Sequence, residues 1–135
     1  MTYKVRDIKR ADNVKDAVKY LGNDYYNEKI NLEDNKHKVS EFNRYTYILD
    51  TYVIFLCKKA IEMLDDNIPT VKIIDTFKNR DWKTYSYSSK AYYGEYLSKI
   101  LFESKSTSRT TLLSIQTMYL EEASKILIDV MEDFI

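Results

Sequence analysis

Residues 39–64 read VSEFNRYTYILDTYVIFLCKKAIEML, and this stretch decides the fold. Its apolar residues recur every three or four positions, the spacing that places side chains on one face of an α-helix. The chain has 135 residues but only two glycines and one proline, so few positions would interrupt helices. The positions of this face are Val39, Phe42, Tyr45, Leu49, Tyr52, Leu56, Ala60 and Met63. The sequence therefore predicts an all-α protein.

The predicted architecture is a single-domain helical bundle, residues 1–135, of about five helices with a long central helix at about 36–66. Within that helix residues 52–57 are apolar on every side, which is typical of a helix surrounded by others. A chain of this length can bury roughly two-thirds of its extended surface, which is enough for one core. No internal repeat, domain linker or strand pattern competes with this interpretation.

One shorter helix is predicted before the central one and another after it. The first begins at a cap on Asp12 or Asn13 and ends near Lys29, before the polar stretch 31–35. The other opens at Pro69, whose fixed φ suits a first helical turn, and ends at 79–81. The apolar residues expected to pack inward are Val14, Val18, Leu21 and Tyr25 in the first, and Val71, Ile74 and Phe77 in the other.

The second half of the chain contains two more predicted helices. One spans residue 82 or 83 to about 104 and is followed by the polar loop 104–108. The last begins at a cap on Thr107 or Ser108 and carries two adjoining apolar stripes, which predict burial against two neighbours. The first stripe is Leu112, Ile115, Tyr119, Ala123, Ile126, Val130 and Phe134, and the second is Leu113, Leu120, Leu127 and Met131.

The composition excludes most cofactor and catalytic chemistry. The two glycines, Gly22 and Gly94, cannot form a phosphate-binding loop, which needs clustered glycines. The single histidine, His37, excludes histidine-pair zinc sites and paired Glu-x-x-His di-iron sites. The single cysteine, Cys57, lies in an apolar run and is predicted to be a buried, inert thiol. We therefore expect no cofactor, no metal and no enzymatic activity.

Charge and hydropathy indicate the compartment. The chain has 21 basic and 21 acidic residues, so it lacks the overall field that usually accompanies nucleic-acid or membrane binding. No stretch resembles a secretory signal or a membrane span, so we expect a cytoplasmic protein with no membrane partner. The excess of lysine over arginine and the frequent tyrosine, isoleucine and asparagine are typical of an AT-rich genome, such as that of a low-GC bacterium, its mobile elements or a large DNA virus.

Segment 78–99 is the strongest sequence candidate for a binding surface. Its aromatic residues alternate with five basic residues against two acidic ones, which gives a local charge of +3. If the segment is one helix, Tyr85 and Tyr92 face solvent, and exposed aromatic rings beside cations are typical of interfaces. The predicted partner-binding residues are Trp82, Lys83, Tyr85, Lys90, Tyr92 and Lys99.

Two function classes follow from these features. The first is a non-enzymatic protein that binds a protein partner as an inhibitor, immunity, adaptor or host-interaction factor. The alternative is a nucleic-acid-associated accessory protein that uses segment 78–99, and binding that weakens steeply with salt would identify it. The same segment carries a strip of small residues that suits internal packing or, as the alternative, a homodimer seam: Thr84, Ser88, Ala91, Gly94 and Ser98.

Overall fold

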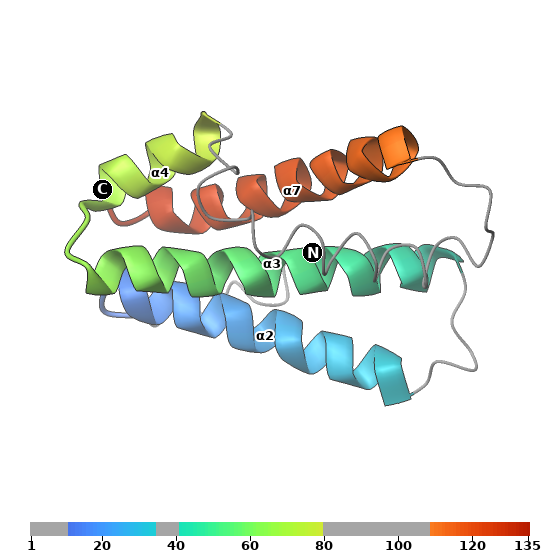
Figure 1. The fold of residues 1–135 in the computed structure, drawn as a ribbon. Helices are drawn as coiled ribbons and strands as arrows, with labels where there is room; N and C mark the ends of the chain where they lie inside the picture. The colour runs from blue at the N-terminus through green and yellow to red at the C-terminus, as the bar shows by residue number, and fades with distance from the viewer. Residues whose placement is uncertain (1–10, 35–40, 80–108) are drawn as a thin grey trace.

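The computed structural model describes residues 11–34, 41–79 and 109–135 (Figure 1). These ranges contain four α-helices and no strand: α2 (Val14–Asp34), α3 (Glu41–Asp65), α4 (Thr70–Lys78) and α7 (Arg109–Glu132). The predicted all-α class is confirmed. The predicted helix at 82–104 and the predicted start of the central helix near residue 36 lie outside the described residues, so the count of five helices stays a prediction.

Helix α3 contacts each of the other three helices (Figure 1). It lies between α2 and α7 in this view, and α4 packs mainly against α7. Helix α2 also touches α7, so the three long helices surround one shared core. The apolar faces read from the sequence therefore meet one another, as a helical bundle requires.

Helix α2 begins as predicted but ends later. The side chain of Asn13 caps it, because the backbone N–H of Asp16 donates to Asn13 Oδ1 at 2.9 Å. The predicted end near Lys29 is wrong, since the helix continues to Asp34. The stretch 31–34 does not end the helix, because asparagine, aspartate and glutamate cost only fractions of a kcal/mol inside a helix. Leu32, the apolar residue of this stretch, is half-buried.

The turn between α3 and α4 has the geometry of a Schellman motif. Asn67 adopts a left-handed φ of 63°, which asparagine tolerates better than most residues. The Ile68 N–H donates to the Met63 carbonyl at 3.0 Å, and the Asn67 N–H donates to the Leu64 carbonyl at 3.0 Å. These bonds satisfy carbonyl groups at the end of α3, which ends at Asp65, one residue before the predicted end.

Helix α4 starts after Pro69, which has a φ of −58°. Its predicted inward face is partly wrong, because Val71 is 51 % exposed and Ile73 is buried instead, together with Ile74 and Phe77. At 100° per residue, Ile73, Ile74 and Phe77 fall within one arc about 100° wide, whereas Val71 lies about 60° beyond its edge. Spacing of three and four residues alone did not separate these two arcs.

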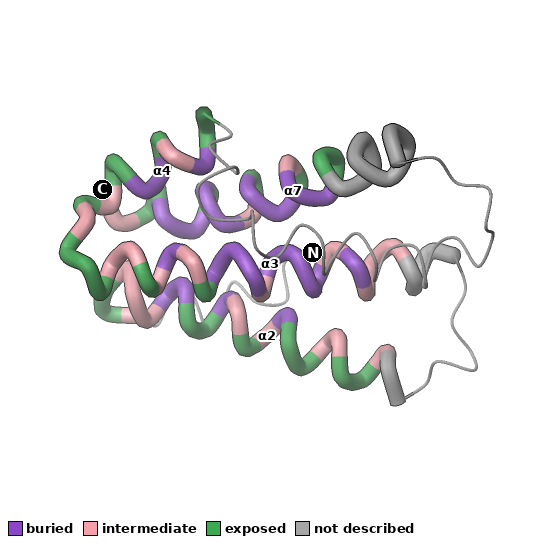
Figure 2. Tube along the Cα trace, in the orientation of Figure 1, coloured by how far each residue is buried: buried purple, intermediate pink, exposed green. Residues whose placement is uncertain are grey.

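The core confirms most of the predicted α3 and α7 positions (Figure 2). In α7 both stripes are buried at the positions whose side chains are described, except that Ile126 is half-buried. Tyr119 stacks on Tyr52 with ring centroids 5.9 Å apart and lies 5.1 Å from the ring of Tyr45. This aromatic cluster joins α3 to α7.

The last residues of the chain also pack against the core. Phe134 is half-buried there, as its place in the first stripe predicted, and its N–H donates to the Met131 carbonyl at 3.1 Å. Helix α7 begins at Arg109, next to the predicted caps, which lie outside the described residues. None of the described helices is both long and apolar enough to span a bilayer.

Leu56→Ala is expected to destabilise the protein by about 2–5 kcal/mol, because Leu56 is fully buried in α3 and its truncation leaves a cavity. Urea denaturation of the full chain measures this change. Lys58→Ala, on an exposed position of the same helix, is the matched control and should change the free energy of unfolding by less than about 0.5 kcal/mol. Equal effects of the two substitutions would contradict the placement of the core.

Candidate partner-binding groove

The six residues predicted to bind a partner all lie in 80–108, outside the described residues, so that prediction stays untested. One basic residue of the wider segment 78–99 is described. Lys78 Nζ lies 3.2 Å from Glu132 Oε2, and this ion pair joins the end of α4 to the end of α7. In the described part of the chain, this lysine is engaged in holding two helices together.

The described residues form a groove between α2 and α3, here called the α2–α3 groove. It has a volume of about 360 Å³, within the range of sites that accommodate ligand groups. Its residues come from one face of α2 and the facing edge of α3: Val18, Lys19, Gly22, Asn23, Tyr26, Ile54, Cys57, Lys58 and Ile61. The groove therefore follows the seam between two helices.

The floor of the groove lies where Gly22 of α2 comes close to Cys57 of α3. A Cβ atom placed on Gly22 would lie 3.3 Å from Cys57 Cβ and 3.8 Å from Cys57 Sγ. The first distance is tighter than ordinary contact between carbon atoms. The absence of a side chain at Gly22 is thus what allows α2 to approach Cys57 closely.

The walls of the groove combine apolar with polar and basic side chains, and one of them presents an aromatic ring to solvent. Tyr26 is 50 % exposed, while Ile54 and Ile61 are half-buried on the opposite wall. Ile30, one turn further along α2 from Tyr26, is 37 % exposed. Exposed apolar and aromatic side chains gathered at a concave seam are a feature of recognition surfaces.

Lys19 stands on the α2 wall and Lys58 on the α3 wall, and both are exposed. Within the described residues neither ammonium group is paired with a carboxylate. Two nearby carboxylates are already paired, since Lys15 Nζ lies 2.6 Å from Asp65 Oδ1 and Lys59 Nζ lies 3.4 Å from a Glu62 oxygen. The groove is therefore a locally positive site in a chain with no formal net charge.

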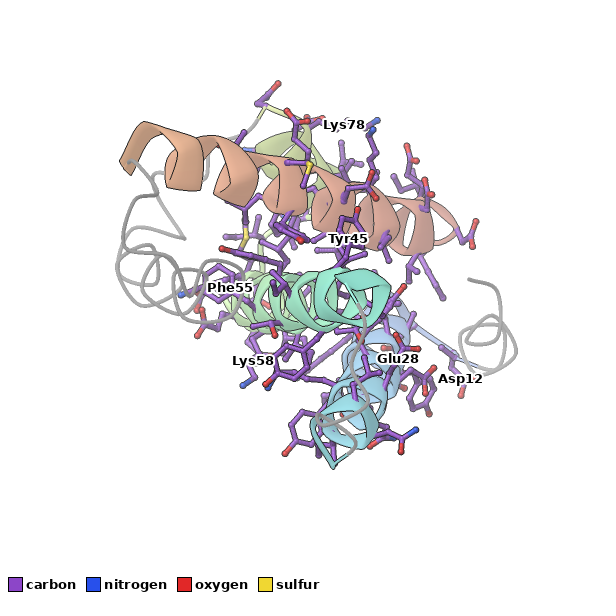
Figure 3. All side chains as sticks on the ribbon, turned by 90° about the vertical axis from the view of Figure 1, so that its right-hand side faces the viewer. Asp12, Glu28, Tyr45, Phe55, Lys58 and Lys78 are labelled. Atoms are coloured by element: carbon purple, nitrogen blue, oxygen red, sulfur yellow. The ribbon has the colours of Figure 1, made fainter. Side chains whose placement is uncertain are left out.

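Acidic groups gather on the other flank of the same seam. Figure 3 shows Lys58 on one side of α2 and Glu28 on the other. Asp50, on α3, is only 2 % exposed, and single carboxylate oxygens of Asp24 and Glu28 are buried. Burial, followed by the charges of Asp50, Cys57 and Asp24, raises the pKa of Tyr25 to about 12. The two flanks of the α2–α3 seam thus differ in charge.

The thiol on the floor of the groove is poorly reactive. Burial raises the pKa of the Cys57 thiol, so the sulfur on the floor stays protonated and is a poor nucleophile at neutral pH. The predicted burial of this cysteine is confirmed. Within the described ranges, no three His, Cys, Asp or Glu side chains are grouped as a metal ion would require.

Comparison with known proteins supplies no relative for this chain. No family model matches the sequence, and neither the curated proteins nor the solved structures contain a match.

Sequence analysis missed the α2–α3 groove, although it identified several of the residues that form it. The sequence predicts burial for Val18 and Cys57, and Gly22 enters that prediction only as one of two glycines that cannot form a phosphate-binding loop. One signal was present: Lys19, Gly22 and Tyr26 recur at helical spacing beside the apolar face of α2. Whether these residues line a groove depends on how α2 is rotated about its axis relative to α3. The spacing of residues within one helix does not specify that rotation.

Gly22→Ile is expected to destabilise the protein by about 1–3 kcal/mol, because a branched side chain on this position forces α2 away from Cys57. Thermal or urea denaturation measures the loss. Asn23→Ile introduces the same side chain at the neighbouring exposed position and should stay within about 0.5 kcal/mol of the parent chain. If Gly22→Ile is as stable as Asn23→Ile, the close approach is not a constraint on the fold.

Tyr25 is expected to make the fold sensitive to alkali. The unfolded chain loses the phenolic proton near pH 10, whereas the folded chain retains it to about pH 12. The folded state therefore binds more protons than the unfolded state above pH 10, and stability falls as pH rises from 10 to 12. Tyr25→Phe should reduce this loss by roughly 1–2 kcal/mol, measured by urea denaturation at pH 9 and pH 11.5. A loss as steep as that of the parent chain would contradict the assignment.

Proposed function

We propose that this chain is a non-enzymatic helical module that binds a protein partner through the α2–α3 groove. The observation that supports this function is the combination of the exposed Tyr26 ring with Lys19 and Lys58 around an apolar floor. Tyrosine combines a large apolar ring with a polar hydroxyl, so it contributes strongly to protein interfaces. Such a module would act by occupying or recruiting its partner, as an inhibitor, immunity factor or adaptor does.

The helical framework suits this function. The groove lies on two long helices, α2 and α3, whose relative position is held by the Gly22 contact and by the Lys15–Asp65 ion pair. Side chains on packed helices lose little freedom when a partner arrives, and a preformed surface binds with a smaller entropic cost. In this proposal the predicted segment 78–99 is a second contact region for the same partner, in a cytoplasmic bundle of five helices with a long central one.

A photo-crosslinking amino acid in place of Tyr26 tests this function in cells of the organism that encodes the chain. The same amino acid in place of Tyr20, which is also on α2 and 39 % exposed but does not line the groove, is the matched control. We expect a discrete protein adduct at position 26 that survives nuclease treatment. The yield of the same adduct from position 20 should be at least fivefold lower. Adduct formation is measured by gel shift and mass spectrometry.

The other outcomes are informative. Equal adducts at both positions, or none at position 26, would remove the groove from the proposed function. Adducts that disappear after nuclease treatment would favour the alternative, a nucleic-acid-associated accessory protein. A homodimer would be recognised as an adduct of the chain with itself.

A further inference from the structure

We infer that the α2–α3 groove receives one amphipathic helix, which it contacts over about two turns and whose apolar stripe is bordered by aspartate or glutamate. This inference rests on the proposed function and specifies the chemistry of the partner. It is drawn from three properties of the groove, namely its length, its apolar floor and the charge of its two walls.

The residues that line the groove set its length, and they span positions 18–26 of α2 and 54–61 of α3. Beyond one end of this lining Lys15 pairs with Asp65, and beyond the other end the ammonium group of Lys29 lies 5.1 Å from the centre of the Tyr47 ring. These contacts also show that the two helices run antiparallel. With a rise of 1.5 Å per residue, positions 18 and 26 of α2 are roughly 12 Å apart, the length of about two helical turns.

The shape of the groove suits a helix better than an extended peptide. Two packed helices leave a furrow along their seam, and a third helix fits such a furrow with its own ridge of side chains. An extended peptide gains affinity mainly from backbone hydrogen bonds to an exposed sheet edge, and the described residues contain no strand. Around Gly22 and Cys57 the groove is lined by the apolar side chains of Val18, Ile54 and Ile61, so an apolar residue of the incoming helix can pack there.

The charges of the groove specify which helix is accepted. Lys19 and Lys58 stand on opposite walls, so they would face the two sides of an apolar stripe lying between them. Two carboxylates of the described structure, Asp65 and Glu62, are engaged by Lys15 and Lys59. An incoming helix with carboxylates beside its apolar stripe would pair with both free ammonium groups, whereas a basic helix would be repelled.

A displayed library of 14-residue helical peptides with randomised surface positions tests this inference with the full chain as bait. We expect the selected peptides to carry apolar residues at helical spacing and to be enriched in aspartate and glutamate beside them. The double variant Lys19→Glu with Lys58→Glu should instead select lysine and arginine. The control Lys72→Glu with Lys125→Glu makes the same change of net charge at exposed positions outside the groove and should select the same peptides as the parent chain.

The best selected peptide then gives a quantitative readout by fluorescence anisotropy. Binding should weaken at least tenfold in the Lys19→Glu, Lys58→Glu variant and less than twofold in the control variant. It should also weaken at least threefold between 50 and 500 mM salt. Circular dichroism of each variant verifies that the fold is intact, and single substitutions of Lys19 or Lys58 replace the double variant if it is not.

Several outcomes would overturn the inference: no selected peptide, no acidic enrichment, or an enrichment that the groove variant does not change. Concentration-dependent dimerisation of the chain that the groove variant abolishes would assign a second copy of the chain as the occupant instead. If Tyr26 crosslinks to a cellular protein but the library shows no acidic preference, only the stated partner chemistry fails. If acidic helices bind but no cellular protein is captured at position 26, the proposed function fails while the chemistry of the groove stands.

Discussion

The close approach of α2 to α3 at Gly22 and Cys57 is the contact on which the described structure depends. A residue without a side chain lies opposite a small one, so the backbones come near enough for Val18 and Tyr25, one turn to either side along α2, to be buried. Close-packed interiors leave little room to absorb extra atoms. A larger residue at position 22 would separate the helices, expose these neighbours and change the shape of the groove above them. One steric constraint therefore links the stability of the fold to the shape of its candidate binding surface.

The same seam separates two electrostatic environments. On the groove side, Lys19 and Lys58 extend into water, which solvates their charge at little cost. On the other side, Asp50 is almost fully buried beside Tyr25, and the high pKa of that phenol results from its burial and from this carboxylate. Burying polar groups costs free energy unless they are satisfied locally, so this flank is specialised for structure. The charged side chains on the groove side stay in water and avoid this cost, so in the proposed function they can contact a partner.

The predictions from sequence were most accurate where a single helix explains the pattern. The stripes on residues 45–63 and 119–131 pack into the core, because packing against several neighbours follows directly from helical periodicity. Most of their positions are buried, and Tyr45, Leu49, Met63 and Ile126 are half-buried. The predicted cap at Asn13 is confirmed, since capping depends on residues three apart. The end of α2 was placed five residues too early, because polar residues weaken a helix only slightly. The predicted burial of Val71 is wrong, because a helix of only nine residues has few apolar positions to define which arc of its surface is buried. The partner site predicted on segment 78–99 lies outside the described residues and remains a prediction.

The groove belongs to a different class of feature, because it arises between helices. Its walls come from residues on α2 and α3 separated by about 30 to 40 positions, and no local pattern specifies the rotation of one helix against the other. The net charge of the chain also does not predict the groove. The formal charge of zero describes the molecule as a whole, whereas Lys19 and Lys58 line the groove and, within the described residues, belong to no ion pair. Because interactions between exposed charges are screened over about 8–10 Å at physiological salt, we expect a partner in the groove to be influenced by these two ammonium groups more than by the total charge. In the proposed function, recognition therefore depends on the charges that line the groove.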